Sequence, residues 1–183
     1  MESELRLFVN PLDGVALACL TLKNHSGMER MMEVCSYLEP ALASQRDDAA
    51  HPAFQNLFLR TGRLGKYGVA AMRRSRGPSE ENRRLWHLMA TDASLTVLRV
   101  QTDRAAFLGR GRTIYAPRAL EMPISAVADT LGDVIEPCLS LRGQFVLPPG
   151  GRLQFVFATL LPGESGRYPL KNNSLRNGAV SYT

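Results

Sequence analysis

Short apolar runs, each closed by turn-forming residues, recur along most of this sequence and constrain its fold more than any other feature. They recur at intervals of roughly 8 to 16 residues, which is typical of an all-β sandwich. The expected strands are 5–9, 15–22, 31–38, 54–61, 69–73, 85–91, 95–102, 140–147 and 152–160. Only 124–131, which follows Pro123, could form a short helix. We therefore expect an all-β protein, an antiparallel β-sandwich with little helix.

The residues between the runs suggest how some strands connect. Residues 23–27 would join 15–22 to 31–38 as a hairpin, and residues 148–151 would reverse the chain tightly before the last strand. In the first strand, Leu5 and its apolar neighbours alternate with polar residues, which indicates a half-buried edge strand. The polar stretch 43–52 is expected to be a loop.

The chain has 183 residues, enough for one domain with a substantial core. We expect a β-sandwich domain over 1–161 and an irregular tail over 162–183, where proline, glycine and asparagine accumulate. No run reaches the roughly 20 apolar residues that span a bilayer. The acidic N-terminus also lacks the layout of a secretory signal. These features favour a cytoplasmic segment without membrane contact.

The charge balance leaves the class of partner open. The chain carries 22 basic and 17 acidic residues, and most of the basic ones are arginine, whose planar guanidinium suits phosphate, carboxylate and sugar hydroxyls. Basic residues cluster only at 73–76 and 83–84, around a loop with Glu80 and Glu81, so a solvated loop face is favoured. An arginine-mediated nucleic-acid binder remains an alternative. Because these clusters lack interleaved aromatic residues, we expect no nucleic-acid partner.

Signatures of common catalytic and metal sites are missing. The sequence has no GxSxG elbow, P-loop or HExxH motif, its three cysteines form no CxxC pair, and its three histidines are dispersed. Asp47 and Asp48 are adjacent, and neighbouring side chains of an extended segment point in opposite directions, so they cannot act together as acid and base. We expect no catalytic residue, no metal site and no cofactor.

Residues 102–113 (TDRAAFLGRGRT) place an acid and three arginines between two strand-like runs. Gly109 and Gly111 would let the backbone approach a ligand, and Arg110 and Arg112 would bind hydroxyls or an anion. The structural alternative is that Arg104 or Arg112 pairs with Asp103 while the glycines only turn the chain.

Five segments carry a resemblance to a known family: 20–27 (LTLKNHSG), 34–43 (VCSYLEPALA), 47–61 (DDAAHPAFQNLFLRT), 102–113 and 131–161. Over residues 15–161 the chain resembles the glycoside phosphorylases of the cellobiose phosphorylase type, and most of all the C-terminal region of cyclic β-1,2-glucan synthases. The resemblance implies a galactose-mutarotase-like β-supersandwich, truncated at both ends, of the kind that precedes a catalytic (α/α)₆ barrel. The family's general acid and most of its sugar and phosphate contacts lie in that barrel.

The resemblance therefore implies a non-catalytic, carbohydrate-associated module. Its expected partners are the barrel of the parent enzyme, which would be associated with the inner membrane, and a weakly bound β-glucan oligosaccharide. From polarity and position in loops, the expected carbohydrate-binding residues are His51, Asp103, Arg104, Arg110 and Arg112.

The alternative function is a purely structural module without a ligand. A truncated sandwich leaves unpaired strand edges, which recruit further strands. We therefore expect a homo-oligomer that associates through 5–9 or through the strand ending at Leu160.

Overall fold

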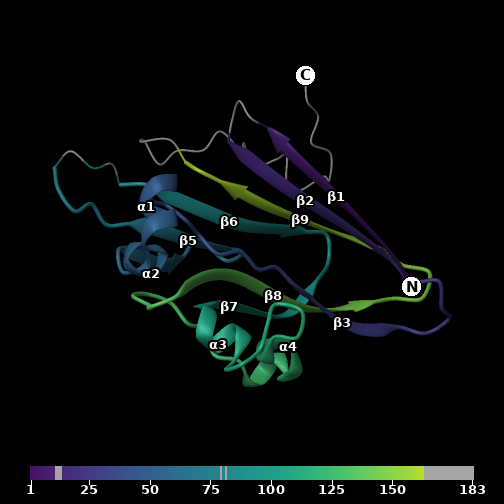
Figure 1. Ribbon diagram of the computed structural model, residues 1–183. Helices are drawn as coiled ribbons and strands as arrows, with labels where there is room; N and C mark the ends of the chain where they lie inside the picture. The colour runs from purple at the N-terminus through teal and green to yellow at the C-terminus, as the bar shows by residue number, and fades with distance from the viewer. Residues whose placement is uncertain (11–13, 79, 81, 163–183) are drawn as a thin grey trace.

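The computed structural model describes residues 1–10, 14–78, 80 and 82–162, and places their strands in two antiparallel sheets (Figure 1). The larger sheet has the order β1 (Glu2–Asn10), β2 (Val15–Lys23), β9 (Arg152–Leu160), β6 (Arg84–Thr91), β5 (Gly68–Arg73) and β4 (Leu59–Arg63). The smaller has the order β3 (Arg30–Cys35), β8 (Pro137–Leu147) and β7 (Leu95–Asp103). The predicted antiparallel β-sandwich is confirmed. The tail predicted at 162–183 lies, beyond Pro162, outside the described residues.

The hairpin predicted at 23–27 is instead a corner between the two sheets, whereas the tight reversal predicted at 148–151 is present and also joins the two sheets. The chain passes from β2 in the large sheet to β3 in the small one, and from β8 in the small sheet back to β9 in the large one. Asn24 explains both corners. Its buried Nδ2 donates to the carbonyls of Met28, Leu147 and Pro148, and its backbone N–H donates to Gly151. One side chain thus fixes the two corners against each other.

Aromatic and aliphatic side chains from both sheets form the core. Alternate residues of a strand point to the same face, so β8 and β9 each direct a row of side chains between the layers. The fully buried members of these rows include Leu139, Leu141, Phe145 and Leu147 of β8 and Phe155 of β9. The Phe145 and Phe155 ring centroids are 4.8 Å apart, a favourable aromatic contact across the sandwich.

One buried polar contact also joins the sheets. His87 of β6 is 3% exposed, and its ring nitrogens lie 2.9 Å from Thr159 Oγ1 on β9 and 2.8 Å from Ser36 Oγ, just after β3. Burial lowers the pKa of His87 to about 4, because the charged imidazolium would lose its hydration. The imidazole is therefore neutral inside the sandwich.

Within the described residues, four short α-helices and a 3-10 turn interrupt the strands. They are α1 (Gln45–Ala50), α2 (Pro52–Asn56), α3 (Arg104–Leu108), α4 (Arg118–Glu121) and η1 (Ile124–Ala126). The loop predicted at 43–52 thus contains a helix, and the strand predicted at 54–61 begins only at Leu59. The helix predicted at 124–131 is reduced to the 3-10 turn. These segments are too short to show a helical periodicity, so their capping residues are the available signal.

Local contacts explain where the helices form. Ser44 caps α1 by accepting the Asp47 N–H at 3.1 Å, and Pro52 occupies the first turn of α2. Arg142 of β8 donates to the carbonyls of Ala119 and Met122 and so holds α4 against the small sheet. In Figure 1, α3 and α4 lie below the small sheet, while α1 and α2 lie beside β5 and β6.

The predicted edge strand is confirmed, although it is more exposed than expected. Among the strands that the structure describes, β1 pairs only with β2 and forms the edge of the large sheet. Leu5, Leu7, Phe8 and Val9 are all exposed, so the strand is not half-buried. The small sheet does not extend far enough to cover it (Figure 1). The strand ending at Leu160 is β9, which is paired on both sides by β2 and β6 and offers no free edge. The expectation of association through that strand was wrong.

Candidate functional site

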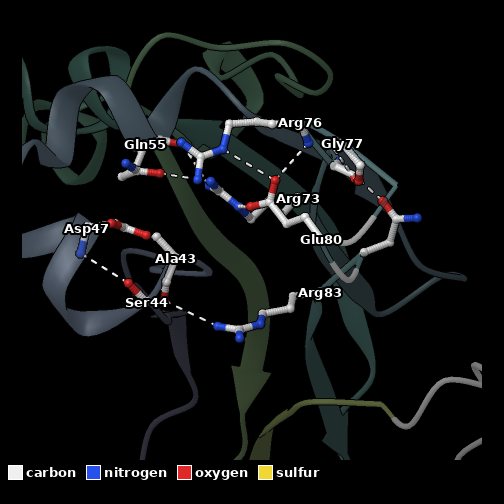
Figure 2. A network of polar contacts seen from close by, with 11 residues as sticks. Ala43, Ser44, Asp47, Gln55, Arg73, Arg76, Gly77, Glu80 and Arg83 are labelled. Atoms are coloured by element: carbon white, nitrogen blue, oxygen red, sulfur yellow. Dashed lines mark hydrogen bonds and ion pairs between the residues drawn. The ribbon is translucent and has the colours of Figure 1, made fainter.

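A polar pocket of about 710 Å³ lies between α1 and the loop joining β5 to β6 (Figure 2). One side is formed by Leu42, Ala43, Ser44 and Asp47, and the other by Arg73, Arg76, Gly77, Glu80 and Arg83. The volume falls in the range of small-molecule sites. Charged groups of both signs, three arginines and two carboxylates, line this cavity.

Arg73, at the end of β5, is the most buried charged side chain of this pocket, with 2% of the side chain exposed. Its Nε donates to Glu80 Oε1 at 2.9 Å and its Nη2 to Gln55 Oε1 at 2.8 Å. Its guanidinium lies over the Phe58 ring, 5.2 Å from the centroid. A buried cation persists only with such partners, so the contacts fix Arg73 in place.

Glu80 holds the loop against this cation. Its Oε2 accepts the Arg76 backbone N–H at 2.7 Å and the Arg76 Nε–H at 3.3 Å, while its Oε1 accepts from Arg73. These donors, first the Arg76 backbone N–H and then Arg73, lower the pKa of Glu80 to about 2. Glu80 is therefore ionised at neutral pH and binds the loop to β5.

On the α1 side of the pocket, fewer of the polar groups are engaged in hydrogen bonds or ion pairs with the described residues. The Asp47 carboxylate makes no hydrogen bond or ion pair with the described residues, although it is half-buried. Arg83 reaches across, its Nη1 donating to the Ala43 carbonyl at 3.5 Å (Figure 2). The pocket thus offers guanidinium donors and a carboxylate acceptor at its surface.

Most of the residues expected to bind carbohydrate in 102–113 have structural partners. Asp103 caps α3, where it accepts the Ala106 N–H at 3.2 Å. Arg104 donates to Glu39 at 2.9 Å and Glu136 at 3.2 Å, and the hydrogen bond to Glu39 is the main reason why its pKa is raised. The structural alternative predicted that an arginine of this segment forms an ion pair. Arg104 does form ion pairs, but with Glu39 and Glu136 rather than with Asp103.

The remaining predicted residues lie in two different places. Arg112 pairs with Glu121 of α4, whereas Arg110 is exposed and makes no ion pair or hydrogen bond with the described residues. His51 is exposed between α1 and α2, one helical turn from Asp47, whose carbonyl accepts its backbone N–H at 3.1 Å. The structure therefore groups Asp103, Arg104, Arg110 and Arg112 around α3, and sets His51 apart beside the pocket.

The sequence interpretation missed the pocket because it took both of its sides for solvated loops. Two local signals were present. Ser44 and Asp47 have the S-x-x-D spacing that marks a helix start, and Arg76 and Glu80 are spaced for an i,i+4 ion pair. Tyr115, in the loop after Arg112, was also overlooked, and this residue is 96% exposed.

Across residues 1–10, 14–78, 80 and 82–162, no three histidine, cysteine or acidic side chains come together as a metal site would require. None of the helices in this part of the chain is both long and apolar enough to cross a membrane.

Comparison with known proteins places the fold in a family. Residues 1–172 match the sequence profile of the glycosyl hydrolase 94 supersandwich domain. The chain is also 34% identical over 142 residues to the cyclic beta-(1,2)-glucan synthase NdvB of Rhizobium meliloti (strain 1021). That alignment covers 76% of this chain and 5% of the length of the synthase. The match agrees with the resemblance carried by residues 47–61 and 102–113, and the chain belongs to the glycosyl hydrolase 94 family through its supersandwich domain.

Proposed function

We propose that this chain is a non-catalytic, carbohydrate-associated module of an enzyme that acts on β-1,2-glucan, in which it braces a catalytic (α/α)₆ barrel and contacts the glucan. One observation carries the proposal: the family match is to the supersandwich domain and not to a catalytic domain. The name of the 34% identical relative, a cyclic beta-(1,2)-glucan synthase, supports the choice of sugar.

The chemistry of the pocket supports a non-catalytic role. Cleavage of a glycosidic bond commonly needs one carboxyl group that donates a proton and a second that acts as nucleophile or base. Glu80 cannot donate a proton at neutral pH, because its pKa is about 2. Asp47 and Asp48 are adjacent on α1, where successive side chains point about 100° apart, so they do not flank one bond.

The surface around α3 supports contact with a glucan. Arg110 and Tyr115 are exposed in one loop, where a guanidinium and an aromatic face could hydrogen-bond to and stack on a sugar ring. In the parent enzyme this loop would form part of a wall of the cleft. Half of a cleft buries little of a ligand, so we expect weak binding by the chain alone.

An activity assay with three arms tests this proposal. In the first arm this chain is incubated alone with β-1,2-glucan oligosaccharides. In the second it is mixed with the segment that follows the matched region in the Rhizobium meliloti synthase, expressed separately, and in the third that segment is incubated without this chain. We expect no turnover by this chain alone, and more turnover by the mixture than by the segment alone, because the sandwich stabilises the barrel. Equal turnover by the segment with and without this chain would contradict the bracing role.

A second function, self-association as a structural module, is favoured by β1. The strand pairs with β2 in unbroken register from Glu2↔Lys23 to Asn10↔Val15, and its other edge is unpaired in the described residues. Regular, exposed edges of this kind recruit further strands. A second copy paired antiparallel about Leu5 would bring Glu4 opposite the partner's Arg6 twice, without opposing like charges.

Light scattering over a range of protein concentrations tests this pairing. We expect a dimer that Leu7→Lys converts to a monomer, because the substitution places a charge in the apolar stripe of β1. Met31→Lys is the matched control: Met31 is 72% exposed on β3, the edge of the small sheet, against 71% for Leu7. A protein that stays monomeric at high concentration, or a dimer lost only in Met31→Lys, contradicts pairing through β1.

A further inference from the structure

We propose that the pocket between α1 and the β5–β6 loop is a binding site for a neutral sugar unit, held through its hydroxyl groups. The proposal rests on the proposed function for the identity of the sugar, a β-1,2-linked glucose unit. The class of ligand follows from the pocket itself. It is a site separate from the α3 region, where the sequence placed most of the expected contacts.

Two groups on opposite sides of the pocket have hydrogen-bonding atoms that bond to none of the described residues. The Asp47 carboxylate makes no hydrogen bond with the described residues, and neither do the two terminal nitrogens of Arg76, whose Nε bonds to Glu80. These opposite charges line one cavity without forming an ion pair. A ligand that lies between them can satisfy both only if it accepts hydrogen bonds on one side and donates them on the other.

This requirement selects against charged ligands. A phosphate or carboxylate would meet the Asp47 carboxylate, and a cation would meet the arginines. Three arginines against two carboxylates leave the lining with only one net positive charge. Neighbouring hydroxyls of a pyranose are both donors and acceptors, so they match the carboxylate and the guanidinium at the same time.

The donors are held in place before any ligand arrives. The Arg73 and Arg76 guanidiniums lie 5.2 Å and 5.5 Å from the centroid of the Phe58 ring, and Glu80 bonds to both arginines. Fixed donors lose little conformational entropy on binding. None of the residues that line the pocket is aromatic, so no ring stacks on the sugar. We therefore expect a dissociation constant on the order of 1 mM.

The test is a titration of the ¹⁵N-labelled full chain with β-1,2-linked gluco-oligosaccharides, followed by NMR through the backbone amides and the arginine Nε–H signals. We expect saturable shifts at Ser44, Asp47 and Arg76. Asp47→Ala should weaken binding about tenfold, the usual effect of losing a hydrogen bond to a charged group. Asp48→Ala is the matched control: Asp48 is the next residue of the same helix, does not line the pocket, and should leave the affinity unchanged.

Inorganic phosphate is the competing ligand. A sugar site and a phosphate site predict opposite changes in affinity when the Asp47 charge is removed. Removing the Asp47 charge should weaken binding of the sugar and strengthen any binding of phosphate. Pocket shifts with phosphate but none with the oligosaccharide would overturn the proposal. Sugar-induced shifts confined to residues 109–116 would also overturn it while leaving the proposed glucan contact intact. The three-arm activity assay is independent of both results.

Discussion

Arg73→Met should lower the free energy of unfolding by about 3 kcal/mol, the lower end of the cost of breaking a buried ion pair. Methionine fills much of the volume but leaves the buried Gln55 side chain without its 2.8 Å donor and Glu80 without one of its two arginines. The lower end applies because Glu80 is partly exposed and keeps Arg76. Urea unfolding followed by the fluorescence of Trp86, the single tryptophan, measures the change.

Arg74→Met provides the matched control for this change. Arg74 is the neighbouring residue, but it is exposed and its Nη2 bonds only to the Leu57 carbonyl, at 2.9 Å. Its replacement should cost less than about 1 kcal/mol. If the Arg73 and Arg74 variants were equally stable, Arg73 would not be the buried anchor of the pocket.

Acid should destabilise the fold through His87, by about 3 kcal/mol between pH 6.5 and 4. Above pH 6.5 the imidazole is neutral in both the folded and the unfolded chain, so the contribution of His87 to stability does not change with pH. Below that pH the unfolded chain binds a proton, while folded His87, with a pKa of about 4, does not. Stability is therefore lost as the pH falls through this window, and the effect levels off below pH 4.

Unfolding measured at pH 7 and pH 5 in paired variants tests the contribution of His87. His87→Gln keeps groups that can bond to Ser36 and Thr159 but removes the titration, so its stability should change less over this interval. His51→Gln should behave like the parent protein, because His51 is exposed. An NMR titration of the parent protein gives the pKa directly, and a value for His87 near 6.5 would contradict this account.

The two-layer β fold could be predicted from the sequence, but the assignment of strands to sheets could not. Alternating apolar residues mark strands such as β9 because the pattern is local. The same turn composition serves a hairpin and a corner between sheets, so residues 23–27 and 148–151 did not distinguish them. Asn24 decides between the two, and its partners Leu147 and Pro148 lie more than a hundred positions away.

The candidate site was harder to predict because the burial of its charges depends on distant residues. Arg73 belongs to a basic cluster that is typical of solvated loops, and its contacts with Gln55 and Phe58, on another segment, help to make it a buried anchor. Arg104 has its main partner at Glu39, on a segment far away in the chain. Sequence patterns identified arginines as important without showing which of them remain available to a ligand.

The most direct test of the central claim, that this domain supports a reaction carried out elsewhere, is the activity of the purified chain on its own. The 183-residue protein is incubated with β-1,2-glucan oligosaccharides, with and without inorganic phosphate, and the products are followed by mass spectrometry. The account predicts that the oligosaccharides remain unchanged under both conditions. Phosphorolysis, hydrolysis or transfer that co-purifies with the chain and is lost when it is unfolded would contradict it.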